Sequence, residues 1–134
     1  MDRFKHDIER LSATRLDDFE ALGKQLQTKL GDVRREGLRD ERTAERGALG
    51  TLEIRNISLR SATDEPSHAN LTFDVALPSI VLDGPLWDGF TMYPARPDAP
   101  DSRPYWSANV SGAKVVLGLA SDHKTVTYVS VSRR

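Results

Sequence analysis

The side chains that could bind a metal are few and scattered in this sequence. There is no cysteine, and no histidine has a second histidine at metal-ligand spacing. A zinc site needs several such ligands together. We therefore expect no metal site at the three histidines, His6, His68 and His123.

Carboxylates and hydroxyls give an equally weak signal for catalysis. Four aspartates could converge as a carboxylate pair or a calcium cage, but each lies where turns ordinarily place aspartate, which is the interpretation we favour. A serine nucleophile would need a nearby base, and no G-x-S-x-G, G-x-G-x-x-G or P-loop motif is present. The sequence predicts no catalytic residue, no cofactor and no enzyme activity. The aspartates are Asp83, Asp88, Asp98 and Asp101.

Aromatic and arginine side chains offer a better candidate site. They surround a segment over 94–104 that contains four prolines, and such a segment is neither a helix nor a central strand. Aromatic rings beside arginine are typical of sugar-binding or protein-docking surfaces. The alternative is that the two tryptophans are core residues and the segment is a rigid connector; we favour the core for the tryptophans and ligand contact for the two arginines. The candidate ligand-binding residues are Trp87, Tyr93, Arg96, Arg103, Tyr105 and Trp106.

Composition excludes some functions. Charged residues make up 29% of the 134 residues, yet the net charge is only -1, which argues against binding nucleic acid or an anionic membrane surface through a basic excess. The first residues include no apolar stretch, and no run is long enough to span a bilayer. We expect a protein without a signal peptide and without membrane insertion, made in a cytoplasm.

The elements that must position these residues differ between the two halves of the chain. All seven prolines lie from Pro66 onward, and charges recur every few residues before Gly47. Apolar residues in that first half follow a repeat of eleven, which is typical of a narrow apolar stripe on a nearly straight helical bundle. The stripe residues expected to form an oligomerisation surface are Phe4, Ile8, Leu11, Phe19, Leu22, Leu26, Leu30 and Val33.

Such a helix over 1–47 would be about 65 Å long, and a β domain about 30 Å across could not cover its stripe. The helix must therefore pair with copies of itself or fold back as a hairpin at Gly31. Because Leu30 and Val33 keep the stripe in phase across that glycine, we favour self-association and keep the hairpin as the alternative.

The second half has the alternating pattern of strands. Strands are predicted over 52–60, 71–77, 87–93, 105–110, 113–119 and 125–132, with 79–82 as a bulged continuation. Ser111-Gly112 is expected to form a two-residue hairpin turn. The sequence thus predicts an α+β protein: a long N-terminal coiled-coil-like helix, serving as an oligomerisation stalk over 1–47, followed by a small antiparallel β-sandwich or barrel over 48–134.

This layout resembles the fibre, spike and decoration proteins of tailed bacteriophages. The resemblance rests on the stripe from Phe4 to Val33 and on the strands from Leu52 to Ser132, and no diagnostic motif accompanies it. It implies a virion structural protein, assembled in the host cytoplasm as a homotrimer. Its β domain would attach to other virion proteins or adhere to a host-surface glycan or protein.

Two other functions fit the sequence. One is a monomeric, soluble carbohydrate- or protein-binding module with a helical hairpin. The other is a small regulator or immunity-type protein that caps a partner with its charged helix. Because the resemblance carries over no binding residue, the order of these hypotheses depends on whether the predicted helix self-associates.

Overall fold

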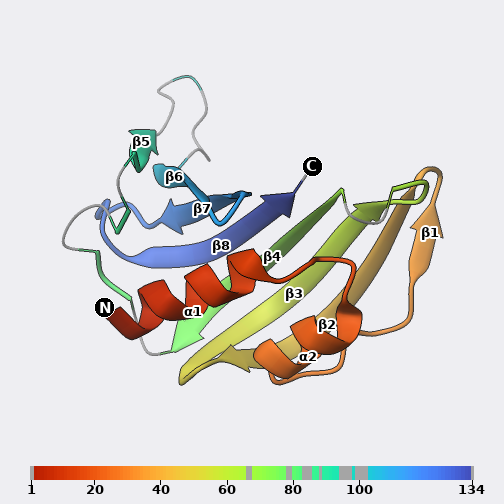
Figure 1. Cartoon of the computed structure of the whole chain (residues 1–134). Coiled ribbons are helices and arrows are strands. Elements are labelled where there is room, and N and C mark those ends of the chain that lie inside the picture. Colours follow the sequence, from red (N-terminus) through yellow and green to blue (C-terminus); the bar gives the residue numbers. More distant parts are fainter. Residues whose placement is uncertain are drawn as a thin grey trace.

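The computed structural model describes residues 2–65, 68–77, 80–82, 86–87, 89–93, 98 and 103–133. Two short helices precede eight strands (Figure 1). No helix among the described residues is long and apolar enough to cross a membrane. The elements are α1 (Asp2–Ala13), α2 (Phe19–Gln25), β1 (Arg34–Glu36), β2 (Arg39–Leu49), β3 (Leu52–Ala62), β4 (Ala69–Leu77), β5 (Thr91–Tyr93), β6 (Tyr105–Val110), β7 (Ala113–Leu119) and β8 (Val126–Arg133).

The predicted long N-terminal helix is wrong, and with it the coiled coil and the hairpin at Gly31. Helix α1 ends at Ala13, and α2 starts anew after Asp18, whose side chain accepts a hydrogen bond from the Ala21 backbone N–H at 3.1 Å. Such an N-cap satisfies a backbone donor that a continuous helix would have bonded internally. The helix therefore breaks between Ala13 and Phe19, well before Gly31.

Strands β1 and β2 replace the rest of the predicted helix. Charged residues lie on both faces of β2, so its sequence lacks the apolar alternation that marks a strand. Pairing with β3 over nearly its whole length holds it in the sheet, from Arg39 opposite Ala62 to Leu49 opposite Leu52. Tertiary pairing here overrides a local pattern that favours helix.

The end of α2 packs directly on β2. The Ala48 backbone N–H donates to the carbonyl oxygen of Leu26 at 2.7 Å, and the Gly31 N–H donates to that of Thr43 at 2.9 Å. Gly47 permits this approach, because a Cβ there would lie 2.5 Å from the Leu26 carbonyl oxygen. The segment after α2 thus occupies part of the outer edge of β2, which would otherwise present unpaired backbone groups.

All eight strands form one antiparallel sheet in the order β1-β2-β3-β4-β8-β7-β6-β5. The predicted sandwich or barrel is therefore also wrong. The sheet curves around α1, and both helices lie on the same face (Figure 1). We call the other face of the sheet the open face, because no described helix covers it.

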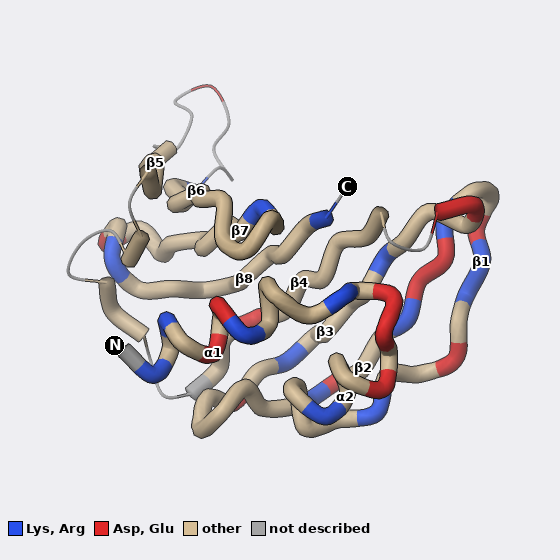
Figure 2. The backbone as a smooth tube through the Cα atoms, in the orientation of Figure 1, with Lys and Arg blue, Asp and Glu red and all other residues tan. Residues whose placement is uncertain are grey.

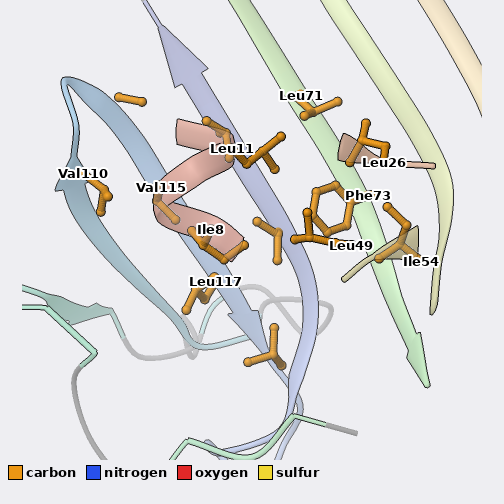
Figure 3. Packing of buried hydrophobic residues seen from close by; sticks show 14 of the residues in the cluster. Ile8, Leu11, Leu26, Leu49, Ile54, Leu71, Phe73, Val110, Val115 and Leu117 are labelled. Carbon is orange, nitrogen blue, oxygen red and sulfur yellow. The ribbon is translucent and has the colours of Figure 1, made fainter. Parts of the chain in front are cut away.

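The core lies between the helices and the sheet. Ile8 and Leu11 of α1 lie against strands from both halves of the sheet, among them the strands that carry Phe73, Val115 and Leu117 (Figure 3). The apolar stripe read from the sequence therefore exists, but it packs on the sheet of its own chain. Most of its members are buried: Phe4, Ile8, Leu11, Leu22, Leu26 and Leu30.

The other two stripe residues lie outside the core. Phe19 packs partly buried against it, with the guanidinium of Arg42 4.3 Å above its ring, a cation–π contact. Val33 is 44% exposed. These two residues therefore keep surface that the core of their own chain does not cover.

Several strand predictions are confirmed, namely those realised as β3, β4, β6, β7 and β8. The Ser111-Gly112 turn has positive φ at both residues (51° and 81°), as a type I′ hairpin requires. From the predicted strand over 87–93 only β5 forms, and the segment over 79–82 contributes a single bridge between Val81 and Thr125. Residues 78–79 lie outside the description.

The turn between β7 and β8 is built around Asp122. Its carboxylate accepts hydrogen bonds from the backbone N–H groups of Lys124 and Thr125, both at 2.9 Å, and from the Thr125 hydroxyl at 2.6 Å. These donors stabilise the ionised form and lower the pKa of Asp122 to about 2. The aspartate fixes the turn that aligns β8 with β7.

Candidate binding surface on the open sheet face

The candidate ligand-binding residues fall on two opposite faces of the sheet. Tyr93 and Tyr105 pair across β5 and β6 on the open face, while Met92 and Trp106 pair on the helix-covered face. Successive strand residues point to opposite faces, so neighbours in sequence are separated by the sheet. Tyr93 and Tyr105 therefore lie on one face of the sheet, and Trp106 lies on the other.

The two tryptophans belong to the core side. The rings of Trp87 and Phe90 meet edge to face with centroids 5.5 Å apart, and Phe90 lies 4.9 Å from Trp106. Both tryptophans pack against the buried cluster. Trp87 keeps its indole N–H buried without a hydrogen-bond partner among the described residues. The interpretation of the tryptophans as core residues therefore fits the structure better.

The structure gives little information about the two arginines of the candidate site. Arg103 is exposed, two residues before β6. Arg96 lies outside the described residues, as does most of the proline-rich segment. The tyrosines are therefore the part of the candidate site whose surroundings the structure describes best.

Three tyrosines lie side by side on the open face. The ladder runs from Tyr93 (β5) to Tyr105 (β6), to Gly118 (β7) and to Tyr128 (β8). The rings of Tyr93 and Tyr105 stack with centroids 4.9 Å apart and planes 17° apart. Because neighbouring strands are about 4.8 Å apart, this tyrosine row is about 14 Å long across the strands.

Gly118 makes the row continuous. A Cβ at Gly118 would collide with the ring of Tyr128, which therefore covers the backbone of β7. Gly118 is buried although it lies on the open face. A glycine covered by a cross-strand aromatic ring lets that ring lie flat on the sheet.

The Tyr128 hydroxyl stays protonated near neutral pH. Burial raises the pKa of Tyr128, and the neighbouring Tyr105 raises it further. A neutral phenol both donates and accepts a hydrogen bond. Tyr128 therefore presents an aromatic ring together with a hydroxyl group that can donate and accept a hydrogen bond.

The ladder continues from the tyrosine row into charged residues. Tyr128 pairs with Asp74 on β4, Asp74 with Arg55 on β3, and Arg55 with Arg46 on β2. The Asn56 amide donates to Asp74 at 2.8 Å, and Arg55 donates to Glu53 at 3.0 Å. Carboxylate, amide and guanidinium groups thus follow three aromatic rings in one line across the sheet.

Small polar side chains fill the surrounding open face. Exposed or half-buried hydroxyls and amides line β4, β6 and β8, and Val116 is their only larger apolar neighbour in these paired rows. This surface favours ligands rich in hydroxyl groups over apolar ones. The side chains are Asn70, Thr72, Ser107, Asn109, Ser130 and Ser132.

The helix-covered side offers a cavity of about 450 Å³ between α2, β1 and β2. Its floor includes Phe19 and Leu59, and its charged groups are engaged locally: Arg35 donates to Asp40 at 2.8 Å. This contact lowers the pKa of Asp40. No three His, Asp or Glu side chains in the described part of the chain are placed to hold a metal ion.

Sequence reasoning missed Tyr128, Gly118, Asp74 and Arg55 as parts of a surface. The alternation over 126–133 does place Tyr128 with the polar residues, which was the available signal. The neighbours across the sheet could not be read from it, because strand order is not written in a single strand.

Comparison with protein-family models, with curated proteins and with solved structures found no match to this chain.

Proposed function

We propose that this protein is a non-catalytic carbohydrate-binding module whose ligand lies on the tyrosine row of the open face. The observation that carries the proposal is the ladder of Tyr93, Tyr105, Gly118 and Tyr128, continued by Asp74 and Arg55. A sugar presents C–H groups on its ring faces and hydroxyls around its rim. Aromatic rings bind the first, and carboxylate, amide and guanidinium groups bind the second.

A protein partner fits this face less well. The centres of protein interfaces are depleted in charge and contain apolar anchors. The open face instead has charged residues within its central ladder, and tyrosine is the only large aromatic residue type among its described strand residues. Tyrosines and small polar residues suit a wet ligand with many hydroxyls, which supports a glycan.

The attachment role inferred from the phage-protein resemblance stays a prediction. The assembly part of that hypothesis depended on a helical stalk, which the chain does not have. Adhesion to a surface glycan needs only the β-sheet, and it is the part of the hypothesis that we retain.

The test is a glycan array with the whole chain, followed by titration calorimetry on a glycan that binds. Tyr93→Ala should weaken binding about tenfold, or about 1.4 kcal/mol, because an aromatic contact face is lost. Val33→Ala is the control, since both side chains are 44% exposed and Val33 lies beside the cavity on the other side of the sheet. The proposal is excluded if no glycan on the array binds the protein, or if Tyr93→Ala binds the glycan as tightly as the unsubstituted protein does.

A further inference from the structure

A second feature of the open face is a shallow hollow of about 500 Å³ at the opposite end of the same strands. It lies where β2, β3, β4 and β8 come together beside the β1–β2 hairpin. The hollow is lined by Leu38, Arg39, Arg60, His68, Asn70 and Ser132, among others.

The lining is basic. Arg39 and Arg60 contribute guanidinium groups, and no acidic residue is among its described lining. Arg133 also borders the hollow, but its guanidinium donates to the backbone carbonyl oxygens of Ser12 and Ser111. Two carboxylates near these side chains are engaged: Glu41 accepts from Arg60 at 2.7 Å, and Glu65 contacts His68 at 2.7 Å. Glu36 faces Arg39 across the hairpin ladder. Arg60 uses its Nε for Glu41, which leaves its terminal nitrogens toward other acceptors.

Asn70 adds an oriented donor. Its side-chain oxygen accepts hydrogen bonds from the hydroxyls of Ser130 at 2.8 Å and Ser132 at 3.2 Å. An amide held by its oxygen presents its N–H₂ group on the other side, and no described residue accepts from that group. Guanidinium and amide donors therefore meet in the hollow, an arrangement suited to a carboxylate.

The hollow and the tyrosine row are connected by continuous strands. Ser132 is four residues from Tyr128 on β8, and Asn70 is four residues from Asp74 on β4. Four strand residues span about 13 Å, a separation that two or three linked sugar rings bridge. Figure 2 shows that charged residues are common in the β1, β2 and β3 half and sparse in the β5 to β8 half.

We propose that the hollow binds the carboxylate of an acidic sugar, so that the ligand class is an acidic oligosaccharide with neutral rings on the tyrosine row. This inference rests on the proposed function. Nucleic acid fits less well, because its phosphates repeat along the whole chain and Asp74 lies directly beside the tyrosine row. An acidic glycan can place its charge in the hollow alone.

The test follows backbone amide signals of the ¹⁵N-labelled full chain during titration with methyl glucuronide and with its methyl ester. The two probes differ in the charge of the carboxyl group and in one added methyl group. We expect saturable shifts at Arg39, Arg60 and Asn70 with the acid, and binding about tenfold weaker with the ester, because charge-assisted hydrogen bonds are lost. Arg39→Gln should weaken binding of the acid, whereas Lys124→Gln, an exposed charge at the β7–β8 turn, should not.

Equal binding of the ester, or no response at these amides, overturns the inference. Equal binding of acetate means that the hollow does not recognise a sugar, and tighter binding of a short oligothymidylate indicates nucleic acid instead. Either result also overturns it. If Tyr93→Ala abolishes glycan binding while the hollow gives no response, the proposed function stands without this inference. If the hollow responds and Tyr93→Ala binds its glycan normally, the carboxylate site in the hollow stands, but the placement of neutral rings on the tyrosine row fails together with the proposed function.

Discussion

The pairing of Gly118 with Tyr128 sets the shape of the open face at the scale of single residues. Glycine in the interior of a strand costs stability, because it loses more backbone freedom on folding than any other residue. Here the cost accompanies a ring that lies over β7 and joins Tyr105 to Tyr128. The same glycine therefore contributes to packing and to the candidate ligand surface.

Gly118→Ala should destabilise the protein by about 1–3 kcal/mol, because the new methyl group displaces the Tyr128 ring. The loss should exceed the small gain that alanine brings to a strand. Urea unfolding measures the change. In the double variant with Tyr128→Ala the two losses should not add, since the colliding ring is already gone. Additive losses would mean that Tyr128 does not cover Gly118 in solution.

Helix α2 shows, at the scale of elements, how a short segment is held by its packing. Seven residues are too few for an isolated helix to be stable in water. The N-cap at Asp18 and the burial of Leu22 and Leu26, both fully inaccessible to solvent, hold it on the sheet. The helix therefore depends on the sheet that it covers.

Leu22→Ala should lower the free energy of unfolding by about 2–5 kcal/mol, as expected for a fully buried leucine in a well-packed core. Leu38→Ala is the matched control, because Leu38 is 83% exposed at the β1–β2 hairpin, and it should change stability by less than about 0.5 kcal/mol. Chemical denaturation of both variants tests the arrangement. Equally small losses in Leu22→Ala and Leu38→Ala would instead mean that Leu22 is not buried in the core of the single chain.

The whole molecule closes its hydrophobic core within one chain. Most of the stripe residues that a homotrimer would have buried between helices belong instead to the core that this chain forms with its own sheet (Figure 3). Strand β1, which like β5 has only three residues, ends one side of the sheet and carries Arg34, Arg35 and Glu36, all exposed. Short charged edge strands disfavour pairing with a further chain.

We therefore expect a monomer, with a mass near 14.9 kDa by light scattering coupled to size exclusion. The apolar stripe is already covered, and no long helix remains to pair. A mass near that of three chains would instead favour the hypothesis of a trimeric virion protein. Its chains would then contact one another through surfaces other than the stripe.

The sequence alone determined the local structure of the second half. Leu71, Phe73 and Val75 alternate with polar residues, and this pattern specifies a strand with one buried face whatever its neighbours are. Likewise the Ser111-Gly112 pair predicts a tight turn. In the structure both residues have the positive φ that such a turn requires. The apolar stripe of the first half correctly identified most of its buried residues.

Only the tertiary structure decided what that stripe packs against. A helical period predicts which residues are buried, but it does not predict whether they pack against a sheet or against another helix. The charged segment over 39–49 became a strand because β3 supplied a ladder, a long-range contact that local propensity does not contain. The candidate surface depends on the same kind of contact: Tyr93, Tyr105 and Tyr128 meet only because the sheet places β5, β6, β7 and β8 side by side.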